Sequence, residues 1–105
     1  MNLKNEIREI EKLYDLYSSG EFSIAETDDM DDRIELFRTE IEKVIDDMPV
    51  AKLRDVMTSE EWIITDDLNG VPVSDYKAMA KDALYEDVSY MLIGCKKLLE
   101  TVDEN

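Results

Sequence analysis

Apolar residues recur every three or four positions through most of the chain, the spacing that gathers them on one side of an α-helix. The longest such pattern runs from residue 74 to residue 102 without proline and is rich in Ala, Leu, Met, Lys and Glu, which favour helix. Ser74 supplies a hydroxyl that can cap the first turn. We predict one central helix over residues 74–102, around which the rest of the chain packs. Its apolar positions are Tyr76, Ala80, Leu84, Val88, Met91, Cys95, Leu98 and Val102.

A second helical pattern covers residues 2–18. Asn2 can cap its start, and Ser18, Ser19 and Gly20 provide its end. Glutamates alternate with lysine and arginine on the remaining surface, so this helix is close to neutral. We expect an amphipathic helix with a structural role. Its apolar positions are Leu3, Ile7, Ile10, Leu13, Tyr14 and Tyr17.

A third helix is predicted from about Asp28 to just before Pro49, because the residue before a proline resists the helical conformation. Thr27 or Asp28 is the expected N-cap. The acidic residues of its first turns lie at the positive end of the helix dipole, where carboxylates are favoured. The expected buried stripe consists of Met30, Ile34, Phe37, Ile41, Val44 or Ile45, and Met48.

A short helix is predicted over residues 50–57, and the segment 61–73 that follows is ambiguous. Thr58 and Glu61 have the spacing of a helix capping box, which favours another helical turn ended by Asn69-Gly70. The same dipeptide could instead join a small hairpin with arms at residues 62–65 and 71–73. We favour the helical turn, with residues 71–73 extended. The fold class is therefore all-α: a small bundle of three long helices and one short helix in a single domain, 1–105, with a minor hairpin at 61–73 as the open alternative.

Charge narrows the functional classes. The chain has 27 acidic and 12 basic residues, no histidine, and a formal net charge of −15. Such a charge opposes direct binding to nucleic acid or to an anionic membrane, because both need a cationic surface. It allows binding to a basic surface of another protein. The simpler interpretation is that acidity only keeps the protein soluble.

The sequence does not contain the residues that several common catalytic and binding sites require. Without histidine there is no imidazole base and no Ser–His or Cys–His pair. Cys95 is the only cysteine, which excludes an intrachain disulfide and a cysteine-based zinc site. The three glycines lie far apart, so no phosphate-binding loop is present. No stretch has the length and apolar character of a signal peptide or membrane span. We expect a cytoplasmic protein that is not an enzyme and has no metal or cofactor.

Carboxylates line up on the predicted third helix, on the face opposite its apolar stripe. Four residues rise about 6 Å along a helix, a spacing comparable to that of backbone phosphates. Residues 21–32 and 55–67 also lack any lysine or arginine. We predict a partner-binding surface that includes Asp28, Asp32, Glu35, Glu42, Asp46, Glu60, Glu61, Asp66 and Asp67.

Two functions fit these patterns. The first is an inhibitor or nucleic-acid-mimicking decoy that binds the basic, nucleic-acid-binding surface of a partner protein. By charge and size alone it is analogous to the small acidic inhibitors that phages direct at restriction or CRISPR nucleases. The alternative is a structural or adaptor protein that forms a homodimer through the broad apolar side of the central helix, its acidity serving only solubility. The residues expected at that contact are Tyr85, Leu92, Ile93 and Leu99.

Overall fold

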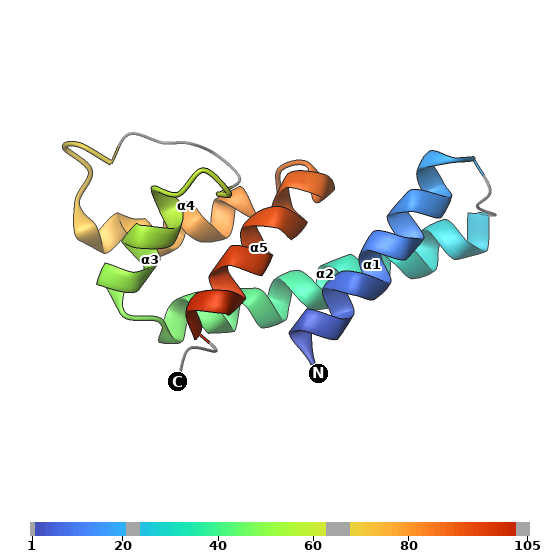
Figure 1. The fold of residues 1–105 in the computed structure, drawn as a ribbon, viewed down its shortest axis with the longest axis horizontal. Helices are drawn as coiled ribbons and strands as arrows, with labels where there is room; N and C mark the ends of the chain where they lie inside the picture. The colour runs from blue at the N-terminus through green and yellow to red at the C-terminus, as the bar shows by residue number, and fades with distance from the viewer. Residues whose placement is uncertain (1, 21–23, 63–67, 103–105) are drawn as a thin grey trace. The chain divides into compact units, whose positions relative to one another are not determined.

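The computed structural model describes residues 2–20, 24–62 and 68–102. Every regular element in these ranges is helical, and no strand occurs there, so the predicted all-α helical bundle is confirmed. The elements are α1 (Leu3–Ser18), α2 (Ile24–Asp47), α3 (Val50–Met57), the 3₁₀ turn η1 (Val73–Asp75), α4 (Tyr76–Ala83) and α5 (Val88–Val102) (Figure 1). No helix within the described ranges is long and apolar enough to cross a membrane.

The chain divides into two compact units, Met1–Glu40 and Ile41–Asn105, and the division falls within α2. In the first unit, α1 lies alongside the first part of α2 (Figure 1). Asn2 caps α1 as expected, since its Oδ1 accepts a hydrogen bond of 3.2 Å from the backbone N–H of Asn5. After α1 the backbone turns at Gly20, whose φ of +78° is a conformation that side chains disfavour. That the whole chain forms a single domain stays a prediction.

The apolar stripe of α2 is the best-predicted feature of the fold. Met30, Ile34, Phe37, Ile41, Ile45 and Met48 are all buried. The predicted start of this helix was wrong. The helix α2 begins at Ile24, so Thr27 and Asp28 lie inside it. Ala25 and Glu26 are strong helix formers, and they favour the extension of the helix toward the N-terminus, before Thr27.

In the second unit, α3 contacts both α4 and α5. Pro49 is the N-cap of α3, and Leu53, Val56 and Met57 are buried. The predicted capping box was wrong. Thr58 ends α3, and its hydroxyl donates a 2.9 Å hydrogen bond to the carbonyl oxygen of Arg54. The same carbonyl already accepts a hydrogen bond from the backbone N–H of Thr58, and the hydroxyl is turned back onto α3, as threonine side chains often are toward the carbonyl four residues earlier.

The single central helix over 74–102 was also wrong, because the chain breaks between α4 and α5. The N–H groups of Leu84, Tyr85 and Glu86 each donate to the carbonyl three residues back, which tightens and ends α4. Asp87 then starts α5, since its Oδ1 accepts a 2.9 Å hydrogen bond from the N–H of Ser89. Ser74 lies inside η1 and caps no helix with its side chain.

Replacing Asp87 by alanine tests this cap. The variant removes the acceptor for the Ser89 N–H, and we expect it to lower the free energy of unfolding by about 1 kcal/mol. Asp87→Asn keeps the side-chain oxygen and should recover most of that loss. Urea denaturation followed by circular dichroism measures both variants. Equal stability of Asp87→Ala and the parent chain would contradict the cap.

Part of the ambiguous segment 61–73 lies outside the described residues, namely positions 63–67, so neither the hairpin nor the helical turn is decided there. At its end, Asn69 and Gly70 form a turn closed by a hydrogen bond from the N–H of Val71 to the carbonyl of Leu68. Pro72 is extended as predicted, but Val73 already belongs to η1.

Candidate interaction surface

The first unit carries a row of exposed carboxylates on α2. Asp28, Asp32 and Glu35, predicted from the sequence, are all exposed, and Asp31 joins them on the same face at helical spacing. Within the described residues, no hydrogen bond or ion pair engages these four carboxylates. We call Asp28, Asp31, Asp32 and Glu35 the acidic row. Asp31 was not among the predicted residues, although its spacing from Asp28 was a sufficient signal.

A shallow hollow adjoins the acidic row. It has a volume of about 350 Å³ and is lined by Asp32, Glu35, Leu36 and Thr39. Leu36 is 59% exposed, so its apolar side chain is accessible at this surface. The hydroxyl of Thr39 donates to the backbone carbonyl of Glu35 at 3.1 Å, so it is turned back onto the helix. The surface therefore offers charge and a small apolar contact side by side.

Arg33 lies in α2 among these acidic residues but does not neutralise the row, because Glu6 of α1 binds it. Its Nε donates to Glu6 Oε1 at 2.9 Å and its second guanidinium nitrogen to Oε2 at 3.3 Å. This hydrogen bonding raises the pKa of Arg33 above its usual value, the nearby charges of Glu6, Glu9 and Asp29 add to the rise, and burial opposes it. The guanidinium therefore stays charged and ties α1 to α2.

The other two carboxylates predicted on this face of the helix, Glu42 and Asp46, lie in the second unit and have partners there. The hydroxyl of Tyr85 donates to Glu42 Oε1 at 2.9 Å. Asp46 Oδ1 lies 2.5 Å from Nζ of Lys81, and Nζ of Lys77 donates to the backbone carbonyl of Asp46. The five carboxylates predicted on one helix face thus divide into two groups. Asp28, Asp32 and Glu35 have no partner within the described chain, whereas Glu42 and Asp46 bind side chains of the second unit.

Lys77 and Lys81 of α4 compensate an unfavourable end of α2. The last turn of α2 has no basic residue and carries Asp46 and Asp47 at the negative end of the helix dipole. We expect the double variant Lys77→Met, Lys81→Met to lower the free energy of unfolding by about 1 kcal/mol, since the Lys81–Asp46 ion pair is partly solvent-exposed. Thermal melting at low and high salt measures it, and the loss should shrink at high salt. A loss that is the same at both salt concentrations would contradict the electrostatic account.

The remaining predicted partner-binding residues are not on α2. Glu60 and Glu61 are exposed in the turn that follows α3. Asp66 and Asp67 lie outside the described residues. Their participation in partner binding stays a prediction.

Of the four residues predicted for self-association, two are exposed and two are buried. Tyr85 and Ile93 are 63% and 47% exposed, and Tyr90 beside them is 62% exposed. Leu92 and Leu99 are buried in the core, so their assignment to a surface contact was wrong. The reason is that α5 starts afresh at Val88 and directs one broad apolar side inward, through Met91, Leu92, Cys95, Leu98 and Leu99.

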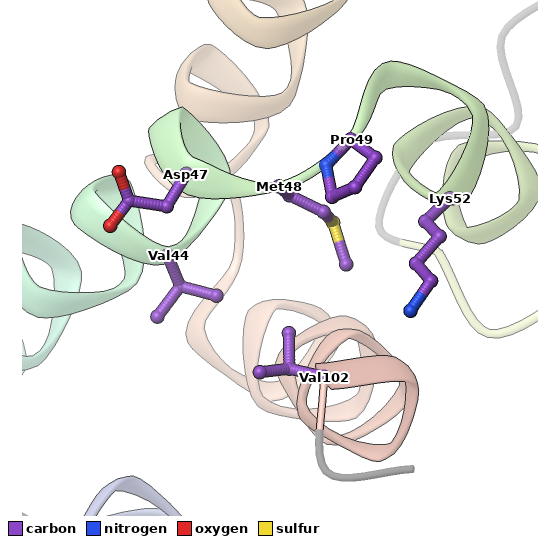
Figure 2. Close-up of a pocket in the computed structure, with 6 residues that line it drawn as sticks. All are labelled: Val44, Asp47, Met48, Pro49, Lys52 and Val102. Atoms are coloured by element: carbon purple, nitrogen blue, oxygen red, sulfur yellow. The ribbon is translucent and has the colours of Figure 1, made fainter. Parts of the chain in front are cut away.

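The second unit also contains an apolar pocket of about 260 Å³ at the end of α2. Figure 2 shows Val44 and Met48 directed toward Val102, with Asp47 and Lys52 on opposite sides. Charges of both signs on its rim select neither an anionic nor a cationic ligand. Among the described residues, no group of three Asp, Glu or Cys side chains is arranged to hold a metal ion.

No family model, curated protein or solved structure matches this chain. Its function is therefore inferred from its own surfaces, of which the acidic row is the most distinctive.

Proposed function

We propose that this chain is a non-enzymatic interaction protein whose acidic row binds a basic, nucleic-acid-binding surface of a partner protein. The observation that carries the proposal is the row itself. Four exposed carboxylates lie on one helical face, and no cation of the described chain pairs with them. The one arginine within this part of the helix that could have neutralised them, Arg33, is held by Glu6.

The helix supports a decoy role because it fixes the positions of the charges. From Asp28 to Glu35 the axis rises about 10 Å, so the carboxylates form a short linear array comparable to a few phosphates of a nucleic-acid strand. A partner's lysines and arginines can bind this array without large rearrangement of the row. The net charge of −15 would steer such a partner toward the chain and repel nucleic acid.

In its finer form, the proposal is a cytoplasmic inhibitor of a nucleic-acid enzyme, of the kind that phages direct at restriction or CRISPR nucleases. Its support is the analogy of charge and size, together with a row that would compete with the substrate rather than modify it.

Competition with DNA tests this function. A bacterial lysate is first enriched on heparin for proteins with nucleic-acid-binding surfaces, and the enriched fraction is passed over the immobilised chain. Retained proteins are then eluted with a short DNA duplex at constant ionic strength. We expect a nucleic-acid enzyme to be retained and to be released by the duplex. Retained proteins that the duplex does not release would contradict the decoy.

A self-associating structural module is the second candidate, and the exposure of Tyr90 and Ile93 favours it. The two functions differ in their response to salt. Binding through the acidic row should weaken steeply as salt is raised, whereas contact through these apolar side chains should persist.

A further inference from the structure

The apolar pocket at the end of α2 carries one charged side chain on each of two opposite sides (Figure 2). Among the described residues, its lining belongs to the second unit alone: Val44, Asp47, Met48, Pro49, Lys52 and Val102. Met48 is buried, and Val44 is half-buried. The volume of about 260 Å³ falls just below the range of about 300–1,000 Å³ that is usual for ligand sites. The pocket therefore suits a small molecule with an apolar part.

Both charges of this pocket are available to a ligand. Asp47 is in the last turn of α2, which contains no basic residue and lies at the negative end of the helix dipole. Lys52 is in the first turn of α3, which contains no acidic residue. Within the described ranges, neither side chain forms a hydrogen bond or an ion pair, whereas the neighbouring Asp46 is held by Lys81. The pocket thus presents an unpaired carboxylate and an unpaired ammonium group with an apolar surface between them.

We infer that this pocket binds a small zwitterion in which an apolar body separates an ammonium group from a carboxylate, and that its ligands are dipeptides with apolar side chains. The ammonium group of the dipeptide lies near Asp47 and its carboxylate near Lys52. Its apolar side chain packs between them, on Val44 and Met48. A dipeptide has no net charge, so the net charge of −15 does not repel it. This binding site does not involve the acidic row.

Charge complementarity selects a dipeptide over other small molecules. A purely anionic ligand meets the Asp47 carboxylate, and a purely cationic ligand meets the Lys52 ammonium group. A free amino acid carries both charges on one carbon atom, so it cannot reach both sides of the pocket with its side chain between them. A dipeptide places its two charges at the ends of an extended backbone, which spans about 3.5 Å per residue. Because Asp47 is exposed to water, we expect millimolar affinity, to which each ion pair contributes about fivefold.

An NMR titration of the isotope-labelled full chain with alanyl-leucine tests the inference. We expect the signals of Val44, Met48 and Val102 to shift, with a dissociation constant in the millimolar range. N-acetyl-alanyl-leucine lacks the ammonium group and alanyl-leucine amide lacks the carboxylate, so each should bind about fivefold more weakly. The absence of shifts at these three residues, or equal affinities for the three compounds, would overturn the proposal.

Two variants assign the two ends of the ligand. Lys52→Met should remove the preference for alanyl-leucine over its amide, and Asp47→Asn should remove the preference over the acetylated form. Arg54→Met and Asp55→Asn are the matched controls, since both residues are exposed on α3 outside the pocket lining, and both preferences should persist in them. Preferences that survive in the pocket variants, or that are lost equally in the controls, would contradict the inference. Circular dichroism of every variant confirms that the helices are retained.

Discussion

Reversing three charges of the acidic row, with Asp28, Asp32 and Glu35 each replaced by lysine, is expected to weaken partner binding by about a hundredfold or more. The three side chains are exposed and unpaired within the described chain, so their replacement leaves the internal contacts of α2 unchanged. Against a basic surface each reversal changes an attraction into a like-charge repulsion, and several such contacts together amount to several kcal/mol. The affinity for the captured partner, measured by isothermal titration calorimetry, gives the effect.

The matched control reverses Asp15, Asp55 and Asp82, which are exposed on α1, α3 and α4. Both variants change the net charge equally, but only the first changes the row. We expect the control to lose only the modest, salt-sensitive part of the affinity that comes from overall charge. Equal losses in the two variants would show that net charge alone drives binding and that the row has no special role. Far-ultraviolet circular dichroism should be the same for both.

The second large effect is on stability. Phe37→Ala should lower the free energy of unfolding by about 3–5 kcal/mol, because it removes a large aromatic ring and leaves a cavity. Phe37 is fully buried and is the largest of the fully buried side chains among the described residues. Since it lies two residues after Glu35 on α2, we also expect the variant to disturb the acidic row at temperatures near its lowered melting point.

Leu36→Ala provides the comparison for Phe37→Ala. Leu36 is the adjacent residue of the same helix, yet it is 59% exposed, so its truncation should change the free energy of unfolding by no more than about 0.5 kcal/mol. Chemical denaturation of both variants measures the difference. Similar losses at the two positions would mean that the burial pattern of α2 is not the one described.

Periodicity was enough to predict α1, α3 and the inward side of α2. Met30, Ile34, Phe37 and Ile41 recur at steps of three or four, and such a long pattern has few alternatives to an amphipathic helix. The end of α2 was equally predictable, because Pro49 disfavours the helical backbone conformation at the residue before it. These features depend on local sequence, so they can be read without knowledge of the tertiary contacts.

The break between α4 and α5 was not predicted, because the apolar spacing continues across it. Leu84 and Val88 are four residues apart in either case, and only Asp87, a good N-cap, distinguishes two helices from one. Leu92 and Leu99 were misassigned for the same reason. A single helix over 74–102 is apolar on too many sides to be covered by the core, whereas the separate α5 buries both leucines.

The candidate site was predicted in outline only. Sequence spacing grouped Asp28, Asp32 and Glu35 with Glu42 and Asp46, because all five share one helical face. Which carboxylates have internal partners depends on α4 and the turn after it, which bring Lys81 and Tyr85 to the second half of α2. These contacts join residues more than thirty positions apart in the sequence, and no helical periodicity reveals them.

The most direct test of the central claim is one capture experiment. The parent chain and the variant with Asp28, Asp32 and Glu35 replaced by lysine are immobilised side by side and exposed to a bacterial lysate at low and at high salt. Retained proteins are identified by mass spectrometry. The proposed function predicts a nucleic-acid enzyme on the parent chain at low salt, lost at high salt and lacking on the variant. The same retained proteins on both chains, at both salt concentrations, would contradict it.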